Sequence, residues 1–309
     1  MKQIKYLVIT LVIALAASSC GTTNTVPITG RKQHLLVTDS YVLGLSNSQY
    51  QEYMKSAKVS TNAANTAMVK RVGQRLASAV ETYLRNNNLA SEIQNYAWEF
   101  NLVNSNEANA FCMPGGKIVV YEGLFPYTKT EGALAIVLGH EIAHAVAKHS
   151  AEQLSKQMRA QYGAQALSTI LSQTSASAAT SAIASQAFGF GAGSLLRKYS
   201  RDNESEADYM GLVFAAMAGY DPNEAISFWQ RMSAGNTSNV PEFFSDHPSD
   251  AKRIAAIQKE MPEVMKYYKP QASTATTTKK TTTTAKKTAT TKAAAKTTAP
   301  KTTKTFRVK

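Results

Sequence analysis

Residues 140–144 of this chain read His-Glu-Ile-Ala-His, within an apolar stretch that predicts a helix over residues 132–149. On a helix, positions i and i+4 share a face, so His140 and His144 can direct two imidazole nitrogens at one metal ion. Glu141 lies about 100° further round the helix, within reach of a water molecule on that metal. This is the pattern of ligands and base that zinc peptidases use. The alternative is a surface helix, but a helix apolar on nearly every side is usually buried, and buried His and Glu need partners.

A catalytic zinc ion needs a third protein ligand. The metzincin pattern would place Gly and His at positions 147 and 150, which instead hold Ala147 and Ser150. His149 is one position away and is expected to point to a different face of the helix. The third ligand should therefore come from another part of the chain.

The acidic residues 204–208 offer that ligand at the start of a second apolar, helix-forming stretch. Glu204 and Asp208 are i and i+4, so Glu204 can bind the metal while Asp208 holds a ligand histidine by its other N–H. Glu206 is expected to point elsewhere, toward solvent or the helix start. Taken alone, such a cluster would reflect the preference of carboxylates for a helix N-terminus.

Four blocks of sequence carry a resemblance to a known family. They are residues 109–116 (NAFCMPGG), 138–144 (LGHEIAH), 199–208 (YSRDNESEAD), and 246–249 (DHPS) followed by Arg253. With residues 26–31, these blocks resemble the HtpX and CAAX prenyl endopeptidase family of gluzincins, in its periplasmic lipoprotein branch (BepA- and LoiP-like). The resemblance implies an α+β fold that is mostly α-helical, with a small β-sheet beside the helix that carries residues 140–144.

The same resemblance implies one Zn²⁺ per chain, held by His140, His144 and Glu204. Glu141 would be the general base, and Asp208 would support the ligands. His247 would face the scissile carbonyl and, with Arg253, stabilise the oxyanion of the tetrahedral intermediate. From the residues alone, residues 246–249 also fit an ordinary N-terminal cap of the following helix, which is predicted to end near Met261.

A small sheet is expected around residues 97–121, with strands at 98–103 and 117–121 and a turn at 114–116. By the resemblance, an edge strand would accept the substrate backbone as an added strand, through Asn109, Ala110, Phe111 and Cys112. A plain hairpin turn is the alternative, and both can hold. The Cys112 thiol is either a switch beside the zinc or, as is usual for free cysteine, a small hydrophobic side chain.

The N-terminus predicts export. Lys2 and Lys5 precede an apolar run that is too short to span a bilayer, so residues 1–19 are interpreted as a lipoprotein signal peptide. Residues 17–20 form a relaxed lipobox, so Cys20 is predicted to be lipidated and to anchor the protein, most simply in an outer membrane facing the periplasm. Ordinary cleavage nearby, leaving a free cysteine, is the alternative.

The predicted organisation is a tether and lead-in over residues 20–40, a metallopeptidase domain over 41–268 that is mainly helical up to residue 95, and a disordered tail over 269–309. Residues 160–196 contain no charged residue and are interpreted as a helical hairpin, with a mobile lid as the alternative. The length of the chain suits one catalytic domain.

The net charge of +13 belongs almost entirely to the tail. Residues 271–309 carry nine Lys and Arg307 with no acidic residue, and Lys2 and Lys5 add two charges, so one net positive charge remains elsewhere. Either the tail is solvated without a specific partner, or it binds anionic envelope polymers by counterion release; no specific nucleic acid partner is expected.

Together these features predict a lipid-anchored zinc endopeptidase that cleaves misfolded or mis-assembled envelope proteins. A second hypothesis is an assembly factor or chaperone that keeps the zinc fold and works with outer-membrane assembly machinery. A third is a surface adhesion protein that uses the basic tail.

Overall fold

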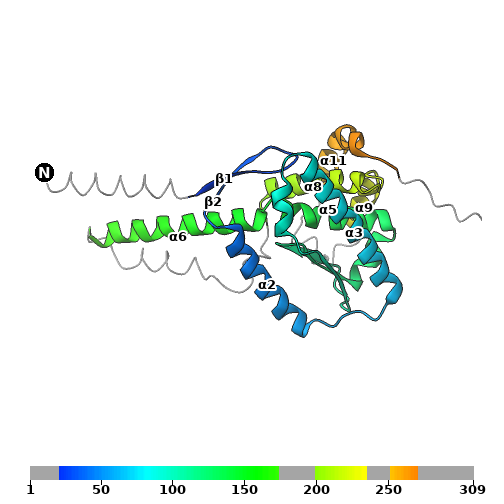
Figure 1. Cartoon of the computed structure of the whole chain (residues 1–309), viewed down its shortest axis with the longest axis horizontal. Coiled ribbons are helices and arrows are strands. Elements are labelled where there is room, and N and C mark those ends of the chain that lie inside the picture. The colour runs from blue at the N-terminus through cyan, green and yellow to red at the C-terminus, as the bar shows by residue number, and fades with distance from the viewer. Residues whose placement is uncertain (1–20, 174–198, 235–250, 271–309) are drawn as a thin grey trace, which may run out of the picture. The chain divides into compact units, whose positions relative to one another are not determined.

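The computed structural model describes residues 21–173, 199–234 and 251–270. The chain divides into two units, residues 1–271 and 272–309, and all of the elements described below belong to the first. The helices, in chain order, are α2 (Asp39–Ser56), α3 (Ala63–Asn86), α4 (Phe125–Thr128), α5 (Glu131–Val146), α6 (His149–Gln173), α8 (Arg201–Met217), α9 (Glu224–Ala234) and α11 (Ala251–Val264), with short 3-10 turns at Ala90–Asn95, Glu122–Leu124 and Met265–Tyr267 (Figure 1). Together with two small sheets, this mostly helical architecture confirms the predicted fold class.

The larger sheet has three strands, β3 (Glu99–Val103), β4 (Ala110–Met113) and β5 (Lys117–Tyr121), in the order β3-β5-β4. β5 pairs parallel with β3 and antiparallel with β4. The β4–β5 turn depends on Gly115 and Gly116, whose φ angles of 88° and 82° disfavour any residue with a Cβ. This hairpin and the edge position of β4 agree with the sequence-based prediction.

The sheet is covered on both faces because successive strand residues point to opposite sides. One face, with Cys112 and Ile118, belongs to the main hydrophobic core together with α3 and α5. The other face, with Met113 and Val119, packs against Tyr50 on α2. The sheet therefore lies between α2 and the helices of the core (Figure 1).

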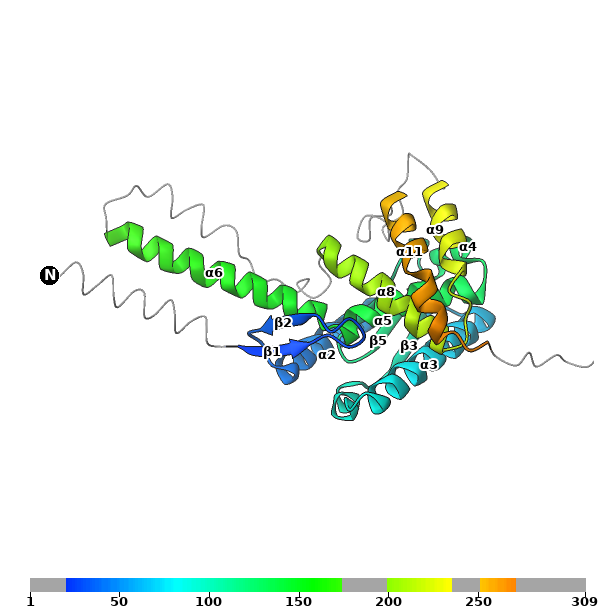
Figure 2. The same ribbon diagram turned by 90° about the horizontal axis from the view of Figure 1, so that it is seen from above.

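α5 is the central helix of the core. The Thr130 hydroxyl caps its start by accepting from the backbone N–H of Ala133. Every residue from Ala133 to Val146 is buried, which explains why the helix is apolar on all sides. α8 packs along one side of α5, α11 packs against α8, and α9 contacts both α5 and α11 (Figure 2). The β1–β2 hairpin (Thr22–Thr25 and Lys32–Leu35) lies beside the first part of α6.

The structure corrects the predicted length of this helix. α5 ends at Val146, and α6 begins at His149, so residues 132–149 do not form one helix. Lys148 between them has a φ of 54°, a left-handed conformation that ends a helix. Ion pairs of Lys148 with Asp39 (2.8 Å) and Glu92 (2.9 Å) offset the cost of this conformation for a residue with a side chain. The break redirects the chain, so that His149 turns back toward α5.

α11 also departs from its predicted end near Met261. It continues through Pro262 to Val264, and both Met261 and Val264 are buried in the main core. That burial offsets the backbone hydrogen bond that proline cannot donate. Of the uncharged stretch 160–196, only the part up to residue 173 is described, as the end of α6; the rest, residues 1–20 and the basic tail lie outside the described residues. Within the described ranges, no helix combines the length and hydropathy needed to cross a bilayer.

Candidate metal centre and active site

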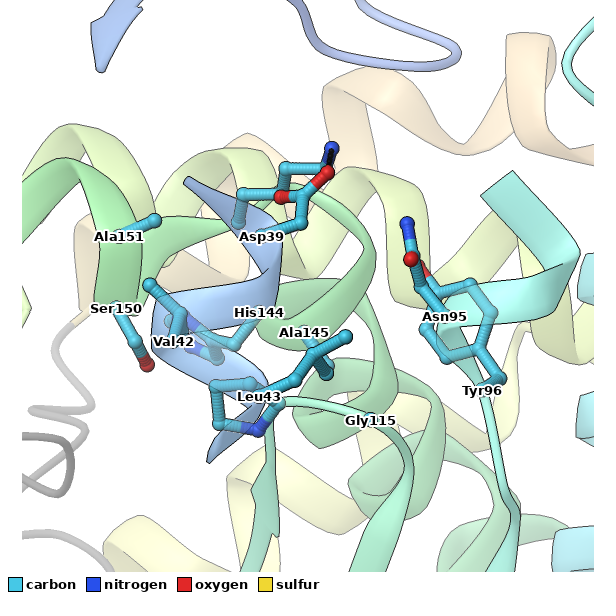
Figure 3. A pocket seen from close by; sticks show the side chains of 12 residues that line it. Asp39, Val42, Leu43, Asn95, Tyr96, Gly115, His144, Ala145, Ser150 and Ala151 are labelled. Carbon is cyan, nitrogen blue, oxygen red and sulfur yellow. Dashed lines mark hydrogen bonds and ion pairs between the residues drawn. The ribbon is translucent and has the colours of Figure 1, made fainter. Parts of the chain in front are cut away.

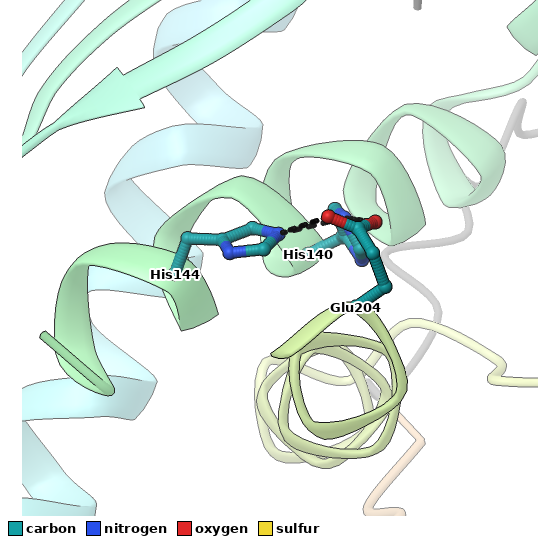
Figure 4. A group of neighbouring side chains, drawn as sticks. All are labelled: His140, His144 and Glu204. Carbon is teal, nitrogen blue, oxygen red and sulfur yellow. Dashed lines mark hydrogen bonds and ion pairs between the residues drawn. The ribbon is translucent and has the colours of Figure 1, made fainter. Parts of the chain in front are cut away.

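Three buried side chains from two helices converge on one point. His140 and His144 come from α5 and Glu204 from the first turn of α8 (Figure 4). The Nε2 atoms of the two histidines are 3.1 Å apart. The Glu204 carboxylate lies 3.4 Å from His140 Nε2 and 3.5 Å from His144 Nε2. This is the ligand set predicted from the sequence, and it is the group of metal-ligating side chains found in the described part of the chain.

The donor set fits a zinc ion. In a tetrahedral site with bonds of about 2.0–2.1 Å, ligand atoms are about 3.4 Å apart. The three separations here, 3.1, 3.4 and 3.5 Å, match that value. Two imidazoles and one carboxylate are a usual protein set for catalytic zinc, which keeps its fourth position for water or substrate.

Asp208 contacts the ring nitrogen of His140 that points away from the ligand cluster. Its Oδ1 lies 3.0 Å from His140 Nδ1. Arg253 donates two hydrogen bonds to the same carboxylate, from Nε to Oδ2 (2.7 Å) and from Nη2 to Oδ1 (2.6 Å). The Arg253 guanidinium lies over the ring of Trp229, 3.7 Å from its centroid. This arrangement fixes the orientation of the His140 ring.

The charges around His140 favour a cation. Burial lowers the pKa of His140, but hydrogen bonds to Asp208 and Glu204 outweigh burial and raise the pKa to about 9. Burial raises the pKa of Asp208, whereas the charge of Arg253 lowers it, and the net shift is downward. Asp208 and Glu204 therefore supply negative charge on both sides of the ring, where a metal ion would bind.

Glu141, the predicted base, is buried on the same turn of α5, with 3% of its surface exposed. Burial raises the pKa of Cys112 on β4 well above its usual range, and the charge of Glu141 adds to this shift. Glu141 thus lies within electrostatic reach of the edge strand. Cys112 is fully enclosed by the core and is held as the thiol, as expected for a small hydrophobic side chain.

β4 is an edge strand of the sheet, and only one of its edges pairs with β5. Tyr121 N–H donates to the Asn109 carbonyl, so by the alternation of an antiparallel ladder Phe111 also pairs with β5. Ala110 and Cys112 then direct their backbone groups to the other edge. The Asn109 side chain already accepts from the Ala110 N–H (2.8 Å).

A small pocket lies next to the metal-ligand cluster (Figure 3). It reaches His144 and is bounded by α2, the end of α5 and the β4–β5 turn. Its walls are mainly apolar: Val42, Leu43, Tyr96, Pro114, Ala145 and Ala151. Two charged side chains also line it, Asp39 and Lys148, which pair with each other at 2.8 Å.

Glu206 is not one of the three metal-binding side chains, but the expectation that it points to solvent or to the helix start is wrong. Glu206 is buried, with 8% exposed, and its Oε2 lies 2.9 Å from His149 Nε2. Burial raises the pKa of Glu206, but hydrogen bonds with His149 and Arg31 lower it to about 2. The face of α8 that carries Glu206 is covered by α6 and by the loop of the β1–β2 hairpin. The spacing of residues along α8 alone could not indicate this cover.

Three side chains near the ligands were missed. His149 contacts His144, Arg31 binds Glu206, and the ring of Tyr199 stacks on His144 with centroids 4.1 Å apart. Two of them, Arg31 and Tyr199, lie in sequence blocks that resemble the family (residues 26–31 and 199–208), and this resemblance was the only signal for them in the sequence. Cys20 and His247 lie outside the described residues, so the lipidation and oxyanion roles stay predictions. The oxyanion role of Arg253 also stays a prediction. Its described contacts include Asp208, the Trp229 ring and, at 3.9 Å, the Glu204 carboxylate.

Comparisons with known proteins agree with this geometry. The Peptidase family M48 profile matches residues 63–261. The chain is 34% identical over 244 residues to mitochondrial metalloendopeptidase OMA1 of Schizosaccharomyces pombe, covering 77% of this chain and 66% of that protein. It is 34% identical over 181 residues to the Arabidopsis thaliana protein of that name, covering 58% and 35%. It is 27% identical over 261 residues to the beta-barrel assembly-enhancing protease of Escherichia coli, covering 81% and 51%.

The matched region thus spans from about a third to about two thirds of these relatives. They include mitochondrial and bacterial proteins, so the lipoprotein branch predicted from the sequence stays a prediction. The M48 profile covers more than half of the chain and runs from α3 to α11, through both helices that supply metal ligands. The chain therefore belongs to peptidase family M48.

Proposed function

We propose that this protein is a zinc-dependent endopeptidase. The observation that carries the proposal is the convergence of His140, His144 and Glu204 within 4.8 Å, with Glu141 beside His140 on the same buried helix. When bound, zinc supplies a Lewis acid that polarises the scissile carbonyl and activates the attacking water. His140, His144 and Glu204 hold it, and Asp208 fixes the His140 ring.

Glu141 moves the proton in this reaction. Its carboxylate takes a proton from the water as the oxygen attacks the carbonyl carbon, and it then delivers that proton to the nitrogen as the carbon–nitrogen bond breaks. His247, from the family resemblance, is proposed to donate a hydrogen bond to the carbonyl oxygen as negative charge develops there.

The substrate backbone is proposed to bind along β4 as an added strand. The Ala110 carbonyl and the backbone groups of Cys112 point to the open edge of the sheet, and Glu141 lies near this strand. Main-chain pairing of this kind accepts many sequences in extended form, which suits a peptidase acting on unfolded segments.

The cavity beside His144 is proposed to receive an apolar substrate side chain. Its walls include Leu43, which shares α2 with Tyr41, a residue that is 58% exposed and does not line the cavity. Leu43→Glu is expected to raise KM for peptides with large apolar residues near the cleaved bond, while Tyr41→Glu leaves KM unchanged. Equal KM values for the two variants would contradict this assignment.

The cellular role is proposed to be the removal of misfolded or mis-assembled envelope proteins by a lipid-anchored enzyme. The signal-like N-terminus, Cys20 and the similarity to the Escherichia coli beta-barrel assembly-enhancing protease support this proposal. Labelling of the full chain with a fatty-acid analogue, followed by membrane fractionation, tests the anchor. Cys20→Ala should abolish both the label and the membrane association; a labelled Cys20→Ala protein would refute the anchor site.

A second candidate function is that of an assembly factor, which the similarity to the beta-barrel assembly-enhancing protease favours. An assembly factor would use the zinc fold to bind its client and would rarely cleave it. Complementation of a deletion strain separates the two functions. If Glu141→Gln restores the phenotype fully, binding is the cellular function; if only the wild type does, cleavage is.

The basic tail is proposed to bind anionic envelope polymers, because residues 271–309 carry ten positive charges and no negative ones. Deletion of the tail should remove salt-sensitive binding to such a polymer and leave peptide cleavage intact.

The decisive experiment measures metal content and casein cleavage for the wild type and Glu141→Gln. One zinc per chain in both proteins, with cleavage only by the wild type, is the expected result. Zinc in neither protein would refute the proposal.

A further inference from the structure

The two histidine ligands are supported in different ways. His140 Nδ1 meets a carboxylate directly, that of Asp208 (3.0 Å). His144 Nδ1 instead meets another imidazole, His149 Nδ1, at 2.8 Å. His149 has no exposed surface, and its Nε2 lies 2.9 Å from Glu206 Oε2. A carboxylate therefore also supports His144, but through one intervening side chain.

The hydrogen positions in this chain of contacts follow from the metal site. His144 directs Nε2 at the ligand cluster, so its Nδ1 carries the proton and donates to His149 Nδ1. His149 Nδ1 is then the acceptor, and its Nε2 carries the proton that is donated to Glu206. Each of these ring nitrogens is thus either a donor or an acceptor, and the hydrogen bonds run from His144 through His149 to the negatively charged Glu206.

Glu206 is held in turn by the loop between β1 and β2. Arg31 donates to Glu206 Oε2 from Nε (2.8 Å) and from Nη2 (2.6 Å), and the Thr29 hydroxyl donates to Oε1 (2.6 Å). Arg31 also donates two hydrogen bonds to Glu152 on α6, at 3.1 and 2.8 Å. The Arg31 guanidinium therefore joins the first turns of α6 and α8.

The loop itself is anchored to the folded unit. Val26 is buried in the main core, and the Tyr83 hydroxyl accepts from the Ile28 N–H (3.0 Å). Gln33 on β2 donates to the Ala147 carbonyl (2.7 Å), at the break between α5 and α6. These contacts hold Arg31 in place, although the hairpin lies outside the residues that match the M48 profile.

We propose that His149, Glu206 and Arg31 are positioning residues for the zinc ligand His144, and that the N-terminal hairpin is an integral part of the metal site. This inference rests on His144 being a zinc ligand, as in the proposed function. It does not depend on peptide cleavage, because its test is zinc affinity.

The test measures the zinc dissociation constant by competition with a chromophoric chelator. Arg31→Ala, Glu206→Gln and His149→Phe should each weaken binding by about 10- to 100-fold, as loss of outer-shell support typically does. Arg71→Ala is the matched control, since Arg71 pairs with Glu131 at the distant start of α5 and is half exposed. Its zinc affinity should equal that of the wild type.

A double mutant separates positioning from a general effect on the fold. If Arg31 acts through His149, then Arg31→Ala should weaken zinc binding little further in the His149→Phe background. The same fold-loss in both backgrounds would overturn the proposal, because Arg31 would then act by another route. Wild type that binds no zinc would instead overturn the proposed function.

His149→Asn provides a second discrimination that does not depend on the stability of the arginine variants. Asparagine retains an acceptor for His144 Nδ1–H but fills the buried site poorly, whereas phenylalanine fills it and accepts nothing. The proposal requires tighter zinc binding by His149→Asn than by His149→Phe. The opposite order would show that His149 only fills space. The visible spectrum of the cobalt-substituted proteins should report the same order as a change in ligand geometry.

Discussion

Gly139 on α5 and Gly211 on α8 face each other where the two helices cross most closely. A Cβ added to Gly139 would lie 2.7 Å from the Gly211 carbonyl oxygen, and one added to Gly211 would lie 2.6 Å from the His140 backbone nitrogen. Gly211 follows Glu204 by two helical turns on the same face. The close approach of the backbones therefore sets how near Glu204 comes to the two histidines.

Gly211→Ala should separate the helices and weaken the metal site. We expect a loss of about 1–3 kcal/mol in the free energy of unfolding, from forced overpacking against backbone atoms, together with weaker zinc binding. Gly44→Ala is the control, because Gly44 is an exposed position on α2 with nothing within 4 Å of an added Cβ. It should stabilise the protein by up to about 1 kcal/mol. Urea unfolding and zinc titration measure both effects, and unchanged zinc affinity in Gly211→Ala would refute the link.

Glu141→Gln should keep one zinc per chain and lose turnover by about 100- to 10,000-fold. The amide preserves the shape of the side chain but cannot take a proton from water. Metal analysis and cleavage of a quenched fluorescent peptide measure the two properties. Wild-type turnover in this variant would exclude Glu141 as the base.

Arg253→Ala should weaken zinc binding by about 10- to 100-fold, because Asp208 loses two hydrogen bonds and no longer fixes His140. Arg253→Lys should not restore affinity, since an ammonium group cannot replace the two-pronged contact. Arg85→Ala, at an exposed pair with Glu81, is the matched control. Zinc affinity as tight in Arg253→Lys as in the wild type would show that charge alone suffices.

Glu152 should make stability depend on pH in acid. Burial raises its pKa, but hydrogen bonds from Arg31 and Lys156 outweigh burial and lower it from 4.5 to about 2. A carboxyl group with a lower pKa in the folded state stabilises the fold above its unfolded pKa, and this contribution is lost as the pH falls toward 2. The free energy of unfolding of the wild type should therefore exceed that of Glu152→Gln near neutral pH, and the difference should shrink below about pH 4.5. Urea unfolding of metal-free protein tests this; a difference constant with pH would contradict it.

Cys112 should react slowly with thiol reagents in the native protein, because it is buried and its pKa is raised by burial and by Glu141. Denaturation in urea should release normal reactivity. Cys112→Ala should keep zinc and activity, at a cost of about 1–2 kcal/mol for the small cavity. Rapid inactivation of the native enzyme by a mild thiol oxidant, absent in Cys112→Ala, would instead support a redox switch.

The sequence determined the parts of the site that lie on one helix or at one strand edge. His140, Glu141 and His144 follow from the spacing of a single helix, and Glu204 with Asp208 from the spacing of another. The edge strand before Gly115 followed from the turn that glycine permits. In each case a local repeat fixes the relative direction of the side chains, so a pattern along the chain is sufficient.

Only the tertiary structure decided what surrounds them. Helical spacing gives the angle between Glu204 and Glu206, but it does not say which neighbour covers each face. Glu206 was therefore expected to point to solvent or to the helix start, and it is buried against His149. The break at Lys148 turns His149 back to His144, although five residues of continuous helix would have carried it away. Arg31 reaches Glu206 across 175 positions of the chain. Contacts at such separations depend on how all the intervening elements pack, and no local pattern encodes that arrangement.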